Sequence, residues 1–96
     1  MDKETLVTAK RFAKVLKKQM NVTRLILFGS RAREDNFVTS DFDFVLVSDG
    51  FSEIPFIRRA SPLYKLWRSS RDLEVLCYTL EEWSRLKDKR GILLNA

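Results

Sequence analysis

Two stretches, LILFGSRAR at residues 25–33 and SDFDFVLV at residues 40–47, decide the expected fold of this 96-residue chain. Each contains a short apolar run bounded by Gly, Ser or Asp, which is typical of a buried strand. After the first run, Gly29-Ser30 is expected to open a short turn or helix through Arg33. Consecutive strands are usually neighbours in a sheet, so we expect this turn to lie beside the acids of the second stretch.

The flanking sequence predicts a small α/β (α+β) domain. Apolar residues recur at helical spacing over residues 3–20, and apolar strands are expected at residues 22–28, 42–47 and 73–78. These elements predict a small mixed sheet of three to four strands covered by helices. A chain of this length supports one core, so we expect a single domain over residues 1–96.

Over residues 51–70, Pro62 interrupts an otherwise helical pattern. Ser61 as N-cap with Pro62 at the first helical position predicts a separate helix over residues 62–69. Further along, TLEE at residues 79–82 has the form of a capping box, which predicts the start of a last helix.

Composition narrows the chemistry. The chain has no His, and Cys77 is its single Cys, which excludes His-based nucleophiles and bases, ordinary zinc sites and intrachain disulfides. Carboxylates without His suit a hard cation such as Mg²⁺. The sequence lacks a run of about 18 apolar residues and lacks the pattern of a signal peptide, so a cytoplasmic protein with no membrane association is expected.

The net charge of +5 is unevenly distributed. Residues 34–53 carry six acids and no Lys or Arg, whereas the segments before and after them hold nine Lys or Arg each. One interpretation is a set of solvated helix faces. The other is an acidic, metal-holding segment framed by cations that attract a polyphosphate or a nucleic acid. Charge alone does not decide between them.

Asp41 and Asp43 are the first candidate site residues. Side chains alternate along a strand, so both carboxylates project from one face, on which the apolar Val45 and Val47 follow. Two like charges at the head of a covered face repel each other unless a cation lies between them. The spacing suits a pair of metal ions that serve displacement at phosphorus. The alternative is that both acids mark a solvated strand start.

Gly29 and Ser30 form the second candidate pair. A strand that ends in Gly-Ser and leads into a helix presents backbone N–H groups and a hydroxyl to which phosphate can bind. An ordinary helix N-cap at a tight turn is the alternative. Arg31 and Arg33 follow directly, and they can neutralise phosphate charge or equally extend into solvent.

These motifs carry a family resemblance. LFGSRAR at residues 27–33, the ten residues between Ser30 and Asp41, and the second acidic strand closely resemble the minimal nucleotidyltransferase (MNT) branch of the DNA polymerase β-like superfamily. CYTLEEW at residues 77–83 continues the resemblance, which covers about residues 22–90. Within the branch, the sequence is similar to stand-alone archaeal and bacterial proteins paired with a HEPN-type partner, the HEPN/MNT antitoxin type. A polymerase β-like nucleotidyltransferase core is implied.

The resemblance implies that Gly29 and Ser30 hold the β- and γ-phosphates of ATP, with Arg31 and Arg33 as further nucleotide-binding candidates. It implies a Mg²⁺-dependent nucleotidyltransferase that moves AMP from ATP to a hydroxyl on a macromolecular acceptor. The implied acceptor is a HEPN-type toxin partner, which would make this chain an antitoxin and an enzyme.

For the metal, the resemblance implies that Asp41 and Asp43 bind two Mg²⁺ ions and that a third carboxylate on the next strand completes the catalytic site. Glu74 is the candidate, although the family more often has Asp at this position, and Asp72 is the alternative ligand. If Glu74 is not a ligand, we expect the chain to bind nucleotide but to transfer it poorly.

Two other functions stay open. One is a non-catalytic, nucleotide-binding antitoxin that neutralises its partner by binding. The other is a nucleic-acid-modifying transferase, which the basic charge allows but no motif specifies. The oligomeric state, whether homo- or hetero-oligomeric, does not follow from the sequence.

Overall fold

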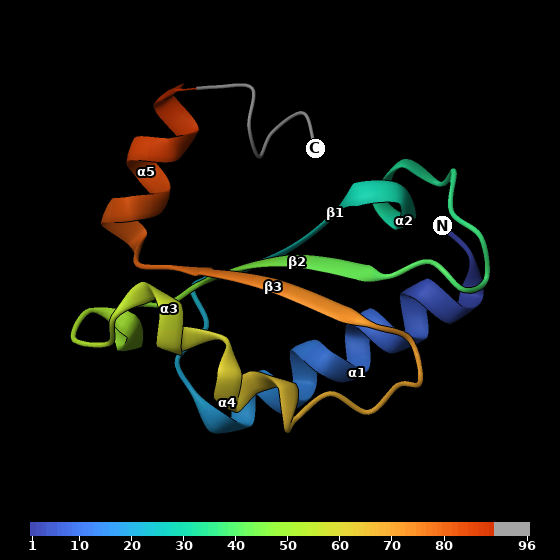
Figure 1. Ribbon diagram of the computed structural model, residues 1–96, viewed down its shortest axis with the longest axis horizontal. Helices are drawn as coiled ribbons and strands as arrows, with labels where there is room; N and C mark the ends of the chain where they lie inside the picture. The colour runs from blue at the N-terminus through green and yellow to red at the C-terminus, as the bar shows by residue number, and fades with distance from the viewer. Residues whose placement is uncertain (90–96) are drawn as a thin grey trace.

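The computed structural model describes residues 1–89, with side chains up to residue 86, and Figure 1 shows their arrangement. A sheet separates α1 on one side from α5 on the other. In chain order the elements are α1 (Lys3–Gln19), β1 (Arg24–Phe28), α2 (Gly29–Arg33), β2 (Phe42–Val47), the 3-10 turn η1 (Asp49–Phe51), α3 (Phe56–Arg59), α4 (Ser61–Tyr64), β3 (Leu73–Tyr78) and α5 (Leu80–Lys89). Among the described helices, none has both the length and the apolar character needed to cross a membrane.

The sheet has the strand order β1-β2-β3 and is mixed, since β1 pairs antiparallel with β2 and β2 pairs parallel with β3. β2 is therefore the central strand, and its last four residues, 44–47, are at most 1% exposed. A strand that is covered on both faces requires such a continuous apolar run. The predicted α+β fold with a small mixed sheet is confirmed, although the first strand begins at Arg24 rather than at residue 22.

Alternate residues of β2 enter two separate apolar clusters. On one face, Phe42, Phe44 and Leu46 pack with Phe12 and Leu16 of α1 in the larger cluster. These five side chains are at most 2% exposed, and burying an aromatic or a Leu side chain is worth about 1.5–3 kcal/mol. The larger cluster therefore holds α1 against the sheet.

The opposite face of β2 carries a smaller apolar cluster and an acid. Val45 and Val47 pack there against Trp83 of α5. Asp43 lies on the same face, two residues before Val45, because side chains alternate along the strand. The buried part of this face thus ends at a carboxylate.

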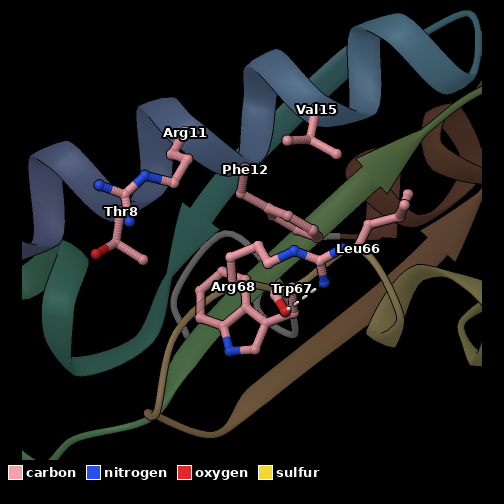
Figure 2. A pocket seen from close by; sticks show the side chains of 7 residues that line it. All are labelled: Thr8, Arg11, Phe12, Val15, Leu66, Trp67 and Arg68. Carbon is pink, nitrogen blue, oxygen red and sulfur yellow. Dashed lines mark hydrogen bonds between the residues drawn. The ribbon is translucent and has the colours of Figure 1, made fainter.

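Trp67 anchors the segment that leads from α4 to β3. Its ring meets Phe12 edge-on with the ring centroids 5.0 Å apart, and it meets Phe42 at 5.2 Å. Figure 2 shows this ring beneath α1, beside Phe12. The indole Nε1–H donates a hydrogen bond to the backbone oxygen of Arg71 over 2.7 Å. The approach to β3 is therefore fixed by tertiary contacts.

The prediction of a helix over residues 62–69 is wrong. α4 ends at Tyr64, and the chain continues through two bonds between residues three apart. The N–H of Leu66 donates to the oxygen of Leu63 over 3.0 Å, and the N–H of Trp67 donates to the oxygen of Tyr64 over 3.3 Å. Pro62 has no N–H to donate to the preceding turn. Ser61 is the first residue of α4, and Ala60 rather than Ser61 occupies the N-cap position. Beyond α4, the Trp67 ring packs against the core.

Glu82 caps α5 and also ties it to α3. The predicted capping box is confirmed, since the N–H of Thr79 donates to Glu82 Oε1 over 2.8 Å and the N–H of Glu82 donates to Thr79 Oγ1 over 3.2 Å. The carboxylate also accepts a 2.6 Å hydrogen bond from Nη1 of Arg59, which is buried. Arg59 donates in turn to the backbone oxygens of Ile54 and Cys77. One carboxylate therefore connects α5, α3 and the end of β3.

These contacts predict a response to acid. The hydrogen bond from Arg59 and then the one from the Thr79 backbone lower the pKa of Glu82 from 4.5 to about 2. A carboxylate whose pKa is lower in the folded chain than in the unfolded chain stabilises the fold above pH 4.5, and the contribution is lost as the pH falls towards 2. We expect Glu82→Gln to lower the free energy of unfolding at pH 7 and to flatten its decline between pH 4.5 and 2 in urea titrations.

Part of the acid decline will remain in this variant. Hydrogen bonds from the Thr5 backbone and from Asn36 also lower the pKa of Asp2 to about 2. The Asp2→Asn variant, measured in the same way, separates the contribution of Asp2 from that of Glu82. Wild type and Glu82→Gln with parallel pH profiles would contradict the assignment.

Candidate active site

The sheet register brings Asp43 and Glu74 together. In the parallel pairing of β2 with β3, Asp43 is the direct partner of Glu74. Both side chains therefore lie on the face of the sheet that also carries Val45. Asp41 is exposed and precedes β2 by one residue. Of the two acids considered on the β3 segment, Glu74 is the one beside Asp43. The backbone oxygen of Asp72 accepts a hydrogen bond from the N–H of Phe42 over 2.9 Å.

The pKa of Asp43 is raised by burial and by the acids that lie near it. Burial first, then the negative charges of Glu74 and Asp41, raise the pKa of Asp43 above its ordinary value of 3.8. A hydrogen bond with Glu74 acts in the same direction, and the positive charge of Arg33 opposes it. Three carboxylates and one guanidinium therefore influence one another at this end of β2. A cation among the acids would remove most of the repulsion.

Gly29 is pressed against Asp43. Phe28 of β1 lies opposite Asp43 in the antiparallel register, so the Gly-Ser turn meets the acid as expected from the sequence. The backbone of Gly29 has φ +76°, and a Cβ built there would lie 2.4 Å from Asp43 Oδ2. Both the left-handed conformation and the lack of space require Gly. The first N–H groups of the short α2 begin at this turn, and such groups have no acceptor within their own helix.

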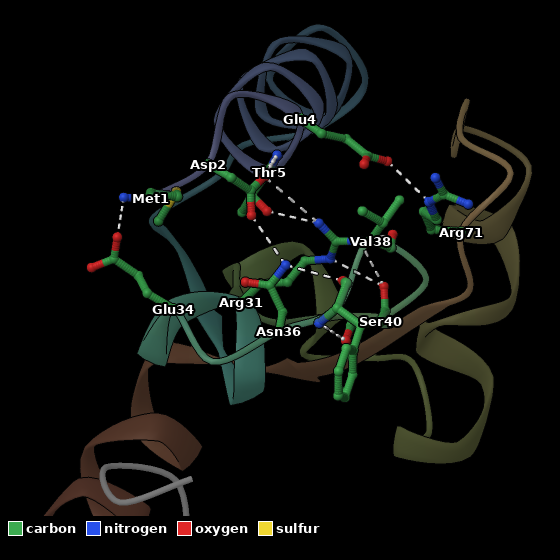
Figure 3. A network of polar contacts seen from close by, with 11 residues as sticks. Met1, Asp2, Glu4, Thr5, Arg31, Glu34, Asn36, Val38, Ser40 and Arg71 are labelled. Atoms are coloured by element: carbon green, nitrogen blue, oxygen red, sulfur yellow. Dashed lines mark hydrogen bonds and ion pairs between the residues drawn. The ribbon is translucent and has the colours of Figure 1, made fainter.

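Arg31 does not lie where a phosphate could reach it. Its side chain is 1% exposed and donates to Thr5 Oγ1 over 2.7 Å, to the Val38 oxygen over 2.8 Å and to the Ser40 oxygen over 2.9 and 3.0 Å (Figure 3). Its guanidinium carbon also lies 4.0 Å from the centroid of the Phe42 ring. The expected phosphate contact is replaced by internal contacts.

One sequence signal pointed to this burial. Thr5 lies on the same helical stripe as Ala9, Phe12 and Leu16, and its side chain is fully buried. A polar residue on a buried apolar stripe needs a hydrogen-bond partner, which here is Arg31. The sequence does not show which of the 18 Lys and Arg residues supplies it.

Arg33 differs from Arg31. Its side chain is about half exposed, and its Nε–H donates to Asp35 Oδ2 over 3.2 Å. Its positive charge offsets part of the rise in the pKa of Asp43, so Arg33 lies within electrostatic range of the acids. Of the two sequence candidates, Arg33 is the cation at this site.

The donors of the site match a hard cation that shares its ligands with a substrate. Among the side chains of residues 1–86, no three His, Cys, Asp or Glu are gathered closely enough to hold a metal ion by themselves. Mg²⁺, however, is usually bound by one or two carboxylates together with substrate phosphates. The close pair Asp43 and Glu74, with Asp41 nearby, fits that mode.

Fold and site together define a small α+β domain with an acidic centre built against a glycine turn. The chain belongs to the nucleotidyltransferase domain family, whose model matches residues 9–94. Among solved structures, it is similar to a provisionally assigned nucleotidyltransferase from Sulfolobus solfataricus. That match has 26% identity and a TM-score of 0.71, and it covers 95% of this chain and 87% of the other.

Two plant structures share the fold alone. BolA1 from Arabidopsis thaliana matches at 20% identity and a TM-score of 0.60, over 78% of this chain and 94% of that one. The BolA domain of SufE1 from the same plant matches at 17% identity and a TM-score of 0.58, over 85% and 98%. No curated protein matches the sequence.

Replacing Gly29 tests the contact with Asp43. We expect Gly29→Ala to lower the free energy of unfolding, because the left-handed conformation alone costs Ala about 1–2 kcal/mol and the new Cβ meets Asp43 Oδ2. Adding Asp43→Ala should recover only the steric part, since the positive φ remains. Chemical denaturation of the two single variants and the double variant measures both parts.

Gly50→Ala is the control. A Cβ at Gly50 would meet only Ser48 Oγ at 3.3 Å, so a smaller loss is expected. Equal losses in the two Gly variants, or full recovery in the double variant, would contradict this account of Gly29.

Proposed function

We propose that this chain uses ATP and Mg²⁺ to transfer AMP to a hydroxyl group on a macromolecular acceptor. Membership of the nucleotidyltransferase domain family supports nucleotidyl transfer. The observation that carries the finer proposal is the register of Asp43 beside Glu74, with the Gly29 turn against Asp43. This arrangement offers hard oxygen ligands next to backbone that a phosphate can approach closely.

The residues of the site would have separate roles in binding the metal and the phosphates. Asp41, Asp43 and Glu74 would hold Mg²⁺ together with the phosphates of ATP. Bound Mg²⁺ would lower the pKa of the acceptor hydroxyl and neutralise charge on the leaving phosphates. Gly29 and Ser30 would bind the β- and γ-phosphates through backbone N–H groups and the Ser hydroxyl, and Arg33 would add positive charge.

The proposed transfer is a single displacement. The acceptor oxygen forms a bond to the α-phosphorus and releases its proton, while the bond from the α-phosphorus to the bridging oxygen breaks and pyrophosphate leaves. In such a reaction most of the rate enhancement comes from positioning and charge neutralisation. No covalent intermediate with the protein is required.

We further propose that the acceptor is a protein, namely a HEPN-type toxin that this chain neutralises as its antitoxin. The motifs use most of the described fold, so little chain remains to enclose an acceptor, and a partner would bring its own docking surface. The family resemblance of the GSRAR and DFD motifs supports this class of partner. A stable or transient hetero-oligomer is then expected.

A second candidate is neutralisation by binding alone. It is favoured by the absence of a ready three-ligand cluster among the side chains described, those of residues 1–86, because a site with too few ligands would bind nucleotide but transfer it poorly. The same experiment separates the two candidates.

The decisive experiment incubates the chain with a HEPN-type partner, Mg²⁺ and ATP that is labelled at the α-phosphate. We expect label on the partner, and none when the γ-phosphate is labelled instead. Asp43→Asn should reduce the transfer rate by at least about 100-fold, since it removes a ligand that supports several kcal/mol of charge stabilisation. Asp49→Asn, an exposed acid at the other end of β2, is the control and should remain active.

Partner that stays unlabelled, although it binds the chain and is inhibited by it, would leave neutralisation by binding as the function. Undiminished label with Asp43→Asn would contradict the metal site.

The choice between Glu74 and Asp72 has its own test. Glu74 and not Asp72 is the register partner of Asp43. We therefore expect Glu74→Gln to reduce the rate of α-label transfer by at least about tenfold and to raise the Mg²⁺ concentration needed for the half-maximal rate. Asp72→Asn should have a smaller effect. The reverse order, in initial rates measured over a Mg²⁺ series, would assign the third carboxylate to Asp72.

A further inference from the structure

Arg31 is a buried cation that the proposed chemistry does not use. Three of its nitrogens donate four hydrogen bonds, one to the Thr5 hydroxyl, one to the Val38 oxygen and two to the Ser40 oxygen. Figure 3 shows the guanidinium between the first turn of α1 and the loop that precedes β2. Asp2 at the start of α1 adds a second link to this loop, because its Oδ2 accepts from Asn36 Nδ2 over 3.0 Å.

The contacts of Arg31 lie on both sides of Asp41. Ser40, which accepts two of the hydrogen bonds, is the residue before Asp41. Phe42, whose ring centroid is 4.0 Å from the guanidinium carbon, is the residue after it. Asp41 itself is exposed. The one acid of the site that lies outside a strand is therefore held through its two chain neighbours.

The loop has little other support. Phe37 is 79% exposed and Val38 is 66% exposed, so neither side chain anchors the loop in the core. Its internal bonds are local, with the N–H of Phe37 donating to Ser40 Oγ and the N–H of Ser40 donating to the Phe37 oxygen. Such bonds shape a turn but do not place it relative to the sheet. The ends of the segment are tied by the Asp35 N–H, which donates to the Ser30 oxygen over 3.1 Å, and by the Phe42 N–H, which donates to the Asp72 oxygen over 2.9 Å. Between these ends, the placement of the loop depends on Arg31 and on the exposed Asn36 contact.

We propose that Arg31 is a positioning residue that fixes Asp41 relative to Asp43 and Glu74. The role of Asp41 as a metal ligand rests on the proposed function, whereas the anchoring of the loop does not. Arg is suited to this role because its planar fork donates in several fixed directions and stacks on an aromatic ring. Lys offers neither the fork nor the planar face, so it cannot hold Ser40 and Phe42 together.

The test compares Arg31→Lys with Arg59→Lys. Arg59 is the matched control, because it is also buried, at 6% exposure, and also donates to backbone oxygens, those of Ile54 and Cys77. It serves α3 and α5 rather than the loop before β2. Both variants should lose stability, so a loss of stability alone does not support the proposal.

The first measurement is amide hydrogen exchange in metal-free protein. We expect the Ser40 amide to exchange at least about tenfold faster in Arg31→Lys than in wild type or Arg59→Lys, as the loss of one charged hydrogen bond implies. The amide of Leu46, a fully buried residue of the central strand β2, serves as the reference for global unfolding. The second measurement is Mn²⁺ binding by electron paramagnetic resonance, in the presence of a non-hydrolysable ATP analogue and at a temperature at which all variants are folded. Arg31→Lys should weaken Mn²⁺ binding by about 10- to 100-fold, as is usual for residues that orient metal ligands.

Ser40 exchange and Mn²⁺ affinity that match those of Arg59→Lys would overturn the proposal. Should Arg31→Lys fail to fold, Thr5→Val removes one acceptor of Arg31 and must show a smaller shift in the same direction, and no shift would again overturn it. If wild type binds no Mn²⁺ even with the ATP analogue present, the proposed metal site fails. The exchange rates then decide alone whether Arg31 positions the loop.

Discussion

The structure depends on the burial of β2, which is paired on both edges and covered on both faces. Its register is fixed because a shift of one residue would turn Asp43 into the cluster around Phe12 and move Phe44 out of that cluster to the opposite face. Burying an unpaired carboxylate in an apolar core costs far more than any single apolar contact returns. The acid that marks the site is thus also part of what holds the strand in place.

The same register concentrates unfavourable features at one end of the sheet. A Gly with positive φ, a carboxylate with a raised pKa and a second carboxylate directly beside it all meet where β1 ends and β2 begins. None of these improves packing, and local rules are most often broken at functional sites.

Two buried Arg residues help a small domain hold its helices. Arg31 joins α1 to the loop before β2, and Arg59 joins α3 to α5 through Glu82. Each donates to backbone oxygens that would otherwise lack partners in a partly buried setting. A domain of this size buries a modest share of its surface, so such charge-assisted contacts supplement a limited core. The two Arg residues act at opposite ends of the sheet, Arg31 before the start of β2 and Arg59 near the end of β3.

Features that depend on neighbours in the chain were determined by the sequence alone. The apolar runs of the strands, the Gly29 turn and the capping box from Thr79 to Glu82 each involve residues within a few positions, where spacing predicts the contact. Only the tertiary structure decided that Arg31 is buried, since it contacts Thr5 across 26 positions of sequence, and that Trp67 packs against Phe12 beyond the end of α4. It likewise placed Glu74, rather than Asp72, beside Asp43. Strand register and long-range hydrogen bonds depend on how separate segments pack, and no local spacing encodes that.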